Sequence, residues 1–523
     1  MVPMESPVAP SPGVSAPTPA AVGSTRLRNR AVGLVLCGAF FVTFAYFLHV
    51  KPGWNVNTRL ALTYAVVEQG TFAIDDYHGK YYMDTGDKAY FKGHFYCDKS
   101  PALSFLAVPL YFAMWQAKMR WGYMADMPHP TWVLTTLYVI TMTTVGIAGA
   151  LVGVLLWWFA RRFGSSFWTA IALSVALLCG TLLLGYCSLF FPYLPSMLCF
   201  LGSYGILLSG RLGGEEARAA GAPPPLARGL RLFWAGLLLG MAWFFEFTTG
   251  LLGIGLGVYA LWAVRRGPAA MGKFIAGGLI PVGVFFLYTH HIFGEFSVPY
   301  KYEYSEFFRR EMAKGFQGIH LPRLGVLYYI TIHPFKGLFY YSPVLLLWIA
   351  GVWRGLWDKR VGRFRADVVL SVYVVVAYFV FGSGYYLWWG GWAAGDRNLC
   401  PAIPFFLAPL ALWLAPPAGR WKLWLFVPLL AVSLGLNFVI AAVDPQLDQN
   451  IPETVLLQAD ISANYPSPIH HYTFPAFFHG DVALNLGMLL LKLRGLWSLA
   501  PLAATWAAAL LWLRRRARPA GDS

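Results

Sequence analysis

The run A-L-S-F-L-A-V-P-L-Y-F-A-M-W-Q-A at 102–117 decides how the rest of the chain is threaded through a membrane. It is apolar, but it has only 16 residues and contains Pro109, whereas a spanning helix needs about 20 apolar residues. Counting it as a span would reverse every later loop and put the arginine clusters on the external face. We therefore predict an interfacial or re-entrant helix within a first external loop.

The composition is that of a membrane protein. Of 523 residues, 58% are hydrophobic and only 12% are charged, whereas a soluble domain carries about 25% charged residues. Arginine in cytoplasmic loops explains the net charge of +16, and no basic stretch interleaved with aromatics indicates nucleic-acid binding. The six cysteines contain no C-x-x-C pair, so neither a zinc site nor a disulfide framework is indicated.

Apolar runs predict an all-α, polytopic membrane protein with about twelve spans. We place the spans near 31–50, 131–158, 167–184, 192–210, 232–246, 249–264, 274–290, 341–353, 366–383, 402–416, 423–441 and 497–513. The arginine-rich segments between them then face the cytoplasm, as the positive-inside rule requires. We expect both termini in the cytoplasm.

We expect one polytopic domain over residues 25–518, between a disordered tail at 1–24 and a cytoplasmic tail at 519–523. Its large external loops are 51–130, 291–340 and 443–496. With this topology, seventeen of the 24 acidic residues and all eleven histidines face away from the cytoplasm. A reaction on that face cannot use soluble nucleotide donors from the cytoplasm.

The first external loop carries most of the polar chemistry. Its carboxylates include Asp84, Asp87 and Asp98, and the last of these precedes Lys99. Mostly apolar stretches at 59–67 and 102–117 bracket this polar centre. Helices lying in the membrane interface on both sides would form a shelf at headgroup depth, where a lipid phosphate would lie.

Motifs along the chain resemble those of one enzyme superfamily. They are N-T-R-L-A (57–61), G-T-F-A-I-D-D-Y (70–77), G-D-K-A (86–89), G-H-F-Y-C-D-K-S-P-A-L-S (93–104), F-G-E-F-S-V-P-Y (293–300), F-K-G-L-F-Y-Y-S-P (335–343) and W-W-G-G-W-A-A-G-D-R-N-L (388–399). They resemble bacterial GT-C glycosyltransferases, in particular a poorly characterised branch near the protein-mannosyltransferase-like and aminoarabinose-transferase-like groups. Residues 96–101 match the Y-x-(D/E)-K-x-P element of these groups, and the similarity covers roughly 50–500.

This resemblance implies a GT-C fold with an external active site that moves one sugar from a polyprenyl-phosphate carrier to an external acceptor. Two departures from the pattern matter. Asn57-Thr58, or Val56-Asn57, stands where the family has an acidic pair, and Phe191–Pro195 stands where many members have a further acid. A catalytically inactive relative that binds the carrier lipid is therefore an alternative.

The resemblance also implies roles for individual side chains, because a departing phosphate needs cations and an acceptor hydroxyl needs a carboxylate base. We predict Asp87, and after it Asp84, as the base. The predicted ligands of the donor phosphate are Lys99, Arg59, Arg397 and Lys336. Supporting or sugar-binding roles are assigned to Asn57, His94, Asp98, Glu246, Trp388, Trp389, Trp392 and Asp396.

Each assignment has a simpler alternative. Asp84 and Asp87 are also typical of a solvated turn beside Gly86, and a lysine in an interfacial segment can extend to lipid headgroups. Arg397 has Asp396 as a neighbouring partner, and tryptophans often anchor a chain at the membrane interface. The charges of 303–310 indicate a solvated amphipathic helix.

The expected partners are a polyprenyl-phosphate-linked hexose or pentose, membrane lipids, and an envelope glycan, lipid or protein as acceptor. No tight carboxylate trio is visible, so we expect no cofactor and no metal, while leaving a divalent ion open. The alternative from another class is a transporter or flippase for a lipid-linked glycan. That activity needs a polar path, yet Glu246 is the only acid that we place within the spans.

Overall fold

The computed structural model describes residues 19–49, 52–80, 82–122, 129–219, 228–264, 268–416, 419–447, 451, 453–458 and 465–517. Residues 1–18 and 519–523 of the predicted tails lie outside this part of the chain. The first helix begins at Pro19, inside the segment that we assigned to the tail.

Apolar helices form most of the described chain. Eight segments are long and apolar enough to cross a membrane: Leu27–Ala45, His129–Arg162, Tyr193–Glu215, Pro268–Phe293, Lys359–Gly384, Arg397–Leu414, Arg420–Val443 and Gly495–Arg516. Four shorter apolar helices are Phe167–Leu178, Leu230–Phe245, Phe247–Trp262 and Pro343–Trp357. Each segment coincides with one predicted span, so the prediction of an all-α, multi-pass membrane protein is confirmed.

The elements have the following bounds. The helices of the apolar segments are α1 (Pro19–Ala45), α4 (His129–Thr141), α5 (Ile147–Arg162), α6 (Phe167–Leu178), α8 (Tyr193–Ala219), α9 (Arg228–Phe245), α10 (Gly250–Val264), α11 (Pro268–Phe293), α15 (Trp348–Trp357), α16 (Arg365–Gly384), α17 (Leu407–Leu414), α18 (Arg420–Val443) and α22 (Ala500–Ala517). The others are α2 (Trp54–Tyr64), α3 (Ala102–Trp121), α7 (Leu183–Tyr186), α12 (Glu306–Met312), α13 (Leu324–Thr331), α14 (Leu338–Tyr341), α19 (Glu453–Gln458), α20 (Phe474–His479) and α21 (Leu486–Leu491). The strands are β1 (Phe47–Leu48), β2 (Ala89–Phe91), β3 (His94–Tyr96) and β4 (Leu484–Asn485), paired as β1 with β4 and β2 with β3.

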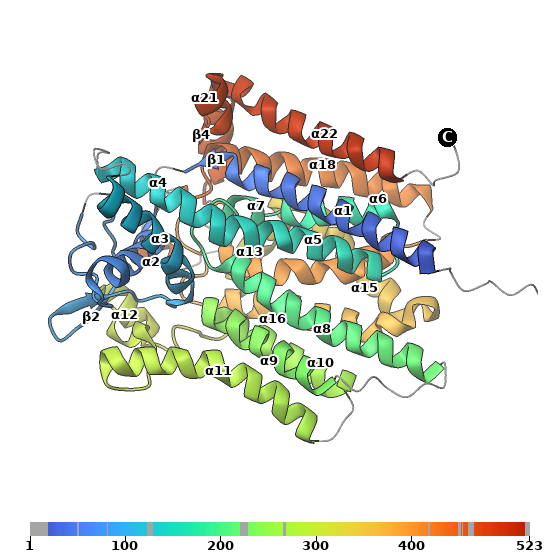
Figure 1. Cartoon of the computed structure of the whole chain (residues 1–523), viewed down its shortest axis with the longest axis horizontal. Coiled ribbons are helices and arrows are strands. Elements are labelled where there is room, and N and C mark those ends of the chain that lie inside the picture. Colours follow the sequence, from blue (N-terminus) through green and yellow to red (C-terminus); the bar gives the residue numbers. More distant parts are fainter. Residues whose placement is uncertain are drawn as a thin grey trace, which may run out of the picture.

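The segment around Pro109 forms α3, which does not cross the helix bundle. In Figure 1, α1 runs from right to left, and the chain re-enters the bundle from the same left end through α4 and α5. Between them, α2, β2 and α3 lie at that left end. The prediction that 102–117 is not a span therefore agrees with the structure, in which the helix continues to Trp121.

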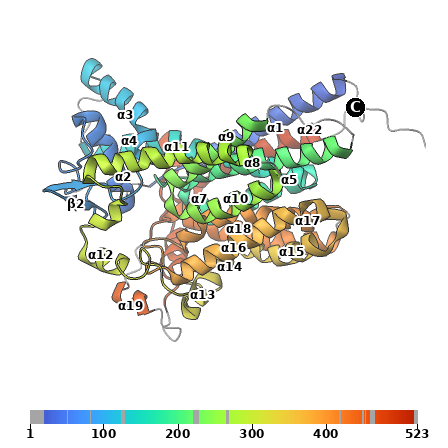
Figure 2. The ribbon, with the colours of Figure 1, turned by 90° about the horizontal axis from the view of Figure 1, so that it is seen from below.

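Segments of the second loop lie at the end of the bundle that carries the first loop. Figure 2 shows α12 on the same side as α2, α3 and β2. Two backbone contacts join the loops: an isolated bridge between Ala89 and Glu303, and a hydrogen bond of 2.9 Å from the Tyr304 amide to the Lys88 carbonyl. We call this end of the bundle, with both loops, the loop end.

Close helix packing positions the apex between α9 and α10 at the loop end. A Cβ atom on Gly236 of α9 would lie 1.8 Å from the Phe274 carbonyl oxygen of α11, so only glycine permits this approach. At the apex, the Ser100 hydroxyl donates a hydrogen bond to the Phe244 carbonyl. This hydrogen bond connects the first loop to the Phe244-Phe245 pair, which directly precedes Glu246.

A buried charge, Asp367, lies at the start of α16, inside the segment 366–383 that we predict to be a span. Asp367 is 1% exposed and accepts hydrogen bonds from Arg211 at 2.5 Å, Tyr204 at 2.7 Å and Tyr259 at 2.9 Å. The expectation that Glu246 is the only such acid was wrong. Because these three donors satisfy the carboxylate, the network explains how the charge is tolerated among apolar helices.

Candidate functional site

A short hairpin brings the predicted base and the predicted phosphate ligand together. β2 pairs antiparallel with β3, with Ala89 opposite Tyr96, and the chain reverses through left-handed Lys92 (φ 50°) and Gly93 (φ 90°). Asp87 lies two residues before Ala89, and Asp98 lies two residues after Tyr96. The antiparallel register therefore places both carboxylates at the open end of the hairpin.

Lys99 lies between these two carboxylates. Its Nζ atom is 3.3 Å from an Asp87 oxygen and forms a shorter ion pair with Asp98. The side chains of Lys99 and Asp87 are 13% and 14% exposed, whereas that of Asp98 is fully buried. A cation and a carboxylate thus reach the surface side by side, with a second carboxylate beneath them.

The charges of this cluster depend on one another. Burial alone would lower the pKa of Lys99, but the carboxylates of Asp87 and Asp98 outweigh it and raise the pKa well above its ordinary value. Burial also raises the pKa of Asp98, against the opposing effect of Lys99. Lys99 is therefore held in its cationic form.

The turn before the hairpin fixes Asp87. The Thr85 hydroxyl accepts a hydrogen bond of 3.1 Å from the Asp87 amide and lies 3.0 Å from the Trp54 carbonyl, to which it can donate. Asp84 differs, because its side chain is exposed and its carbonyl accepts a hydrogen bond of 2.7 Å from the Asn57 amide group. Of the two predicted bases, only Asp87 contacts Lys99 in the described structure.

Glu303 joins the cluster from the second loop, and sequence reasoning missed it. The bridge to Ala89 brings this carboxyl beside the hairpin, where it is 1% exposed. Burial and the neighbouring Asp98 raise the pKa of Glu303 far above the ordinary carboxyl range, which favours its protonated form. The prediction of a solvated helix is wrong for this residue. No local signal marks this residue, because its burial depends on the bridge to Ala89, which lies far away in the sequence.

The glutamine variant Glu303→Gln should retain the neutral hydrogen-bonding side chain and so stabilise the protein increasingly as pH rises. In the wild type, unfolding releases the Glu303 proton once the pH exceeds about 4.3, the ordinary glutamate pKa, so the buried carboxyl costs stability above that value. Thermal unfolding of both proteins from pH 4 to pH 8 measures the difference. A constant difference across this range would contradict a raised pKa of Glu303.

The Arg59 and Asn57 side chains donate hydrogen bonds to backbone carbonyls of the first loop. Arg59 is 3% exposed and donates hydrogen bonds to the Ser100 carbonyl at 2.8 Å and to the Asn55 side chain at 3.2 Å. The bond to Ser100 holds α2 against the segment that leads into α3, whereas the bond to Asn55 lies within α2. The predicted contact of Arg59 with phosphate stays a prediction, and the structure places this side chain where it supports the Lys99 turn.

The tryptophan- and glycine-rich segment at 388–397 carries a second partly buried cation, Arg397. Gly390 and Gly391 both have φ near 70°, a left-handed conformation that favours glycine, and they fold the loop back over Arg397. The Arg397 guanidinium lies 5.3 Å from the centre of the Phe191 ring, and the negative charges of Asp87 and Glu246 act on it. Within the described residues it forms no hydrogen bond or ion pair, which leaves its fork available.

Asp396 and the tryptophans hold this loop in different ways. Asp396 accepts a hydrogen bond of 2.9 Å from the Asn398 amide, and it forms no ion pair with Arg397. Trp388 is buried and donates to the Leu456 carbonyl at 2.8 Å, and Trp389 is 3% exposed. Trp392 is 54% exposed. Of the three rings, Trp392 is thus the one most accessible to a ligand.

Lys336 holds the same loop through hydrogen bonds to its backbone. Its side chain is fully buried, and its Nζ atom donates to the Ala393 carbonyl at 2.6 Å and to the Gly391 carbonyl at 3.3 Å. Its ammonium is therefore bound to the backbone segment that precedes Arg397. A direct contact with phosphate stays a prediction.

Replacing Lys336 with methionine should destabilise the loop. We expect the free energy of unfolding to fall by about 1.5–3 kcal/mol, the contribution of a charged hydrogen bond. Thermal unfolding in detergent measures this, with Lys92→Met, at an exposed loop position, as the control. Unchanged stability combined with weakened donor binding would instead identify Lys336 as a direct phosphate ligand.

The remaining predicted residues lie at two places. Glu246, at the apex between α9 and α10, is half-buried and accepts hydrogen bonds from the Thr248 amide at 3.4 Å and hydroxyl at 3.1 Å. Its charge acts on Arg397, so it borders the site. His94 is exposed and pairs with Asp75 at 2.8 Å at the far end of the hairpin. The structure brings Glu246 to the cluster and leaves His94 outside it.

Aromatic side chains surround the charged cluster. The Lys99 ammonium lies 5.5 Å from the centre of the Tyr300 ring, and Tyr385 feels the charges of both Lys99 and Arg397. Among the described residues, no three His, Cys, Asp or Glu side chains are placed to hold a metal ion. Metal independence stays a prediction. The arrangement offers two cations, an accessible carboxylate and aromatic faces.

The chain is similar in structure to membrane proteins that bind lipid phosphates, although its sequence matches no known family. No family model and no curated protein matches the sequence. Among solved structures, ArnT from Cupriavidus metallidurans bound to undecaprenyl phosphate is similar over 94% of this chain and 76% of that chain, with 18% identity and a TM-score of 0.46. The archaeal oligosaccharyltransferase AglB from Archaeoglobus fulgidus, in complex with an inhibitory peptide and a dolichol-phosphate, is similar over 85% of this chain and 60% of that chain, with 10% identity and a TM-score of 0.44.

Proposed function

We propose that this protein is a membrane glycosyltransferase that moves one sugar from a polyprenyl-phosphate carrier to a cell-envelope acceptor. The observation that carries the proposal is the cluster at the open end of the hairpin. There Lys99 reaches the surface beside Asp87, and the charge of Asp87 also acts on Arg397 from a distant loop. The proposed substrate class comes from the motif resemblance, and the proposed catalytic groups come from the cluster.

The transfer makes one bond and breaks another. The acceptor oxygen attacks the anomeric carbon of the sugar, and the bond from that carbon to the phosphate oxygen breaks. The acceptor proton passes to the Asp87 carboxylate, which acts as general base. Polyprenyl phosphate leaves as an anion. It needs no proton donor, because cations stabilise the charge that develops on it.

Two cations are placed to bind the donor phosphate. Lys99 provides a compact charge at the edge of the cluster, and Arg397 provides a planar fork that forms no hydrogen bond or ion pair among the described residues. Tyr300, Tyr385 and the exposed Trp392 give apolar faces on which sugar rings can stack. Lys336 and Arg59 are positioning residues that hold the two cation-bearing segments.

The position of α3 suits a lipid-linked donor. This helix exposes large apolar side chains: Leu106 (46%), Phe112 (49%), Met119 (64%) and Trp121 (80%). Such a surface on a helix at the loop end suits a position in the membrane interface. The Asp98-Lys99 pair directly precedes it in the chain, so the cation lies close to the depth of lipid phosphates.

The transfer would take place on the external face of a bacterial plasma membrane, with both termini in the cytoplasm. We expect cysteines introduced at Lys92 and Trp392, both exposed, to react with an impermeant maleimide from outside intact cells. A cysteine at Arg515, in the last turn of α22, should react only after lysis. Positions 92 and 392 reacting from opposite faces would end the proposal.

Turnover of a defined donor tests the proposed function. Purified protein in lipid nanodiscs would receive polyprenyl-phosphoryl sugars, and release of polyprenyl phosphate together with a glycosylated acceptor would be measured. Binding of carrier lipid without transfer across a donor panel would identify an inactive relative. Movement of the intact donor between leaflets of proteoliposomes, without cleavage, would identify a flippase instead.

A further inference from the structure

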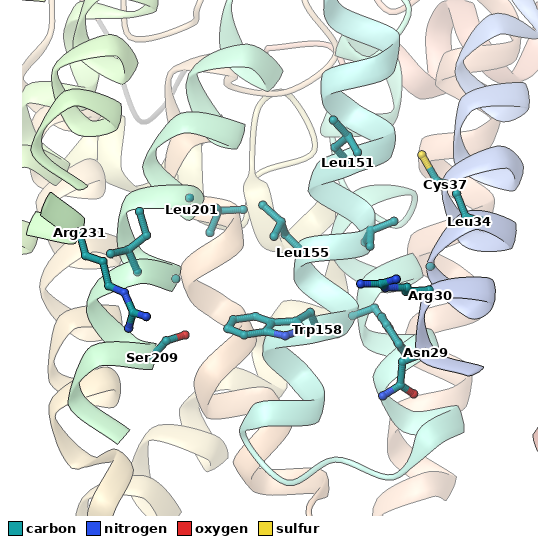
Figure 3. A pocket seen from close by; sticks show the side chains of 16 residues that line it. Asn29, Arg30, Leu34, Cys37, Leu151, Leu155, Trp158, Leu201, Ser209 and Arg231 are labelled. Atoms are coloured by element: carbon teal, nitrogen blue, oxygen red, sulfur yellow. The ribbon is translucent and has the colours of Figure 1, made fainter. Parts of the chain in front are cut away.

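A cavity of about 1000 Å³ opens on the side of the bundle far from the loop end. Its walls come from α1, α5 and α8, together with the start of α9 (Figure 3). The volume is at the upper end of the ~300–1,000 Å³ range of small-molecule sites. None of the residues in the charged cluster lines it, so it is separate from the candidate active site.

One part of this cavity is cationic. Figure 3 shows Arg30 of α1 and Arg231 of α9 on opposite walls, with the Trp158 ring between them. Both arginines are exposed, and within the described residues neither guanidinium forms a hydrogen bond or an ion pair. Arg162 does not line the cavity, but it lies beside it, with its guanidinium 4.9 Å from the centre of the Trp158 ring. The two guanidinium groups therefore favour a ligand that carries negative charge.

The rest of the cavity is apolar. Leu34, Leu151 and Leu155 line it, and Figure 3 places Leu151 and Leu34 away from Asn29 and Ser209, which lie at the polar part. Leu34 is 74% exposed and Leu151 is 40% exposed, so part of this wall faces the surroundings of the bundle. A soluble anion would leave these side chains uncovered, and a neutral lipid would leave the guanidinium groups without partners.

We infer that this cavity binds an anionic glycerophospholipid, with its phosphate at the part that carries Arg30 and Arg231 and its acyl chains against the leucines. Basic pockets between spanning helices have the charge and depth that recognise anionic headgroups. The site lies at the membrane face on which α1 begins, opposite to the loop end. It therefore binds a structural lipid of the other leaflet, independently of sugar transfer.

Lipid binding to the full chain tests this inference. Delipidated protein would be titrated in mixed micelles with dioleoyl phosphatidylglycerol or dioleoyl phosphatidylcholine, and bound lipid would be counted by native mass spectrometry. The wild type should bind phosphatidylglycerol at least tenfold more tightly than phosphatidylcholine. The double variant Arg30→Gln with Arg231→Gln should lose about tenfold or more of the phosphatidylglycerol affinity.

Two further variants keep the result interpretable. Arg514→Gln with Arg515→Gln removes two exposed arginines that do not line the cavity, and it should bind like the wild type. Leu155→Trp fills the apolar part and should expel the lipid while both arginines remain. Equal losses of phosphatidylglycerol affinity in the two arginine double variants would overturn the inference. Equal wild-type affinities for phosphatidylglycerol and phosphatidylcholine would also overturn it. Unchanged lipid binding by folded Leu155→Trp protein would also overturn it.

Discussion

Replacing Asp87 with asparagine should lower the rate of sugar transfer by about 10²–10⁴-fold, the usual contribution of a general base. The amide cannot take the acceptor proton, but it occupies almost the same volume. Lys99 keeps its ion pair with Asp98, so the fold and the binding of carrier lipid should persist. The measurement is kcat and KM for transfer from a polyprenyl-phosphoryl sugar, together with carrier-lipid affinity.

Asp84→Asn is the matched control for this variant. The two residues lie in the same turn, but the Asp84 side chain is exposed and only its carbonyl has a partner in the cluster region, through Asn57. We expect Asp84→Asn to transfer sugar at close to the wild-type rate. If Asp84→Asn were inactive and Asp87→Asn active, the base would be Asp84. Full activity in the double variant would exclude both residues.

Replacing Lys99 with methionine should lower transfer by about 10²–10³-fold, as does the loss of one preorganised charge at a developing anion. The single variant also leaves the fully buried Asp98 without its cation, which costs about 3–5 kcal/mol of stability. Activity alone would therefore not distinguish a catalytic residue from a structural one.

A compensating variant separates these two roles. Asp98→Asn combined with Lys99→Met removes both charges, so the free energy of unfolding should recover towards the wild-type value. Transfer should stay low, and carrier-lipid affinity should stay weak. Lys99→Arg, which keeps the positive charge, should retain part of the activity. Recovery of transfer together with stability in the double variant would show that Lys99 serves the fold alone.

The sequence predicted the parts of this protein that depend on local pattern. Hydropathy and arginine position were sufficient for the spans and for the exclusion of α3, because both signals lie in consecutive residues. The Asp87–Lys99 pair was also predictable in outline, since both residues belong to one loop. Their contact could not be derived, because it depends on the register of β2 and β3, whose strands have only three residues each.

Long-range contacts account for what sequence reasoning missed. Glu303 is buried because of a bridge to Ala89, more than two hundred positions earlier. The Lys336 ammonium is engaged within the fold because it donates hydrogen bonds to the carbonyls of Gly391 and Ala393. Asp367 is satisfied by Arg211, a residue that sequence analysis assigned to a cytoplasmic linker. No pattern within a window of ten or twenty residues contains these pairings.

The hairpin of β2 and β3 has a consequence for how this protein can be altered. Its tip, at Lys92 and Gly93, is solvent-exposed, so extra residues there would lengthen the ribbon without disturbing its base. A single deletion inside either strand would shift the pairing by one position and turn alternate side chains to the opposite face. The same thirteen-residue ribbon, 87–99, would then tolerate an inserted reporter at its tip but no shortening along its length.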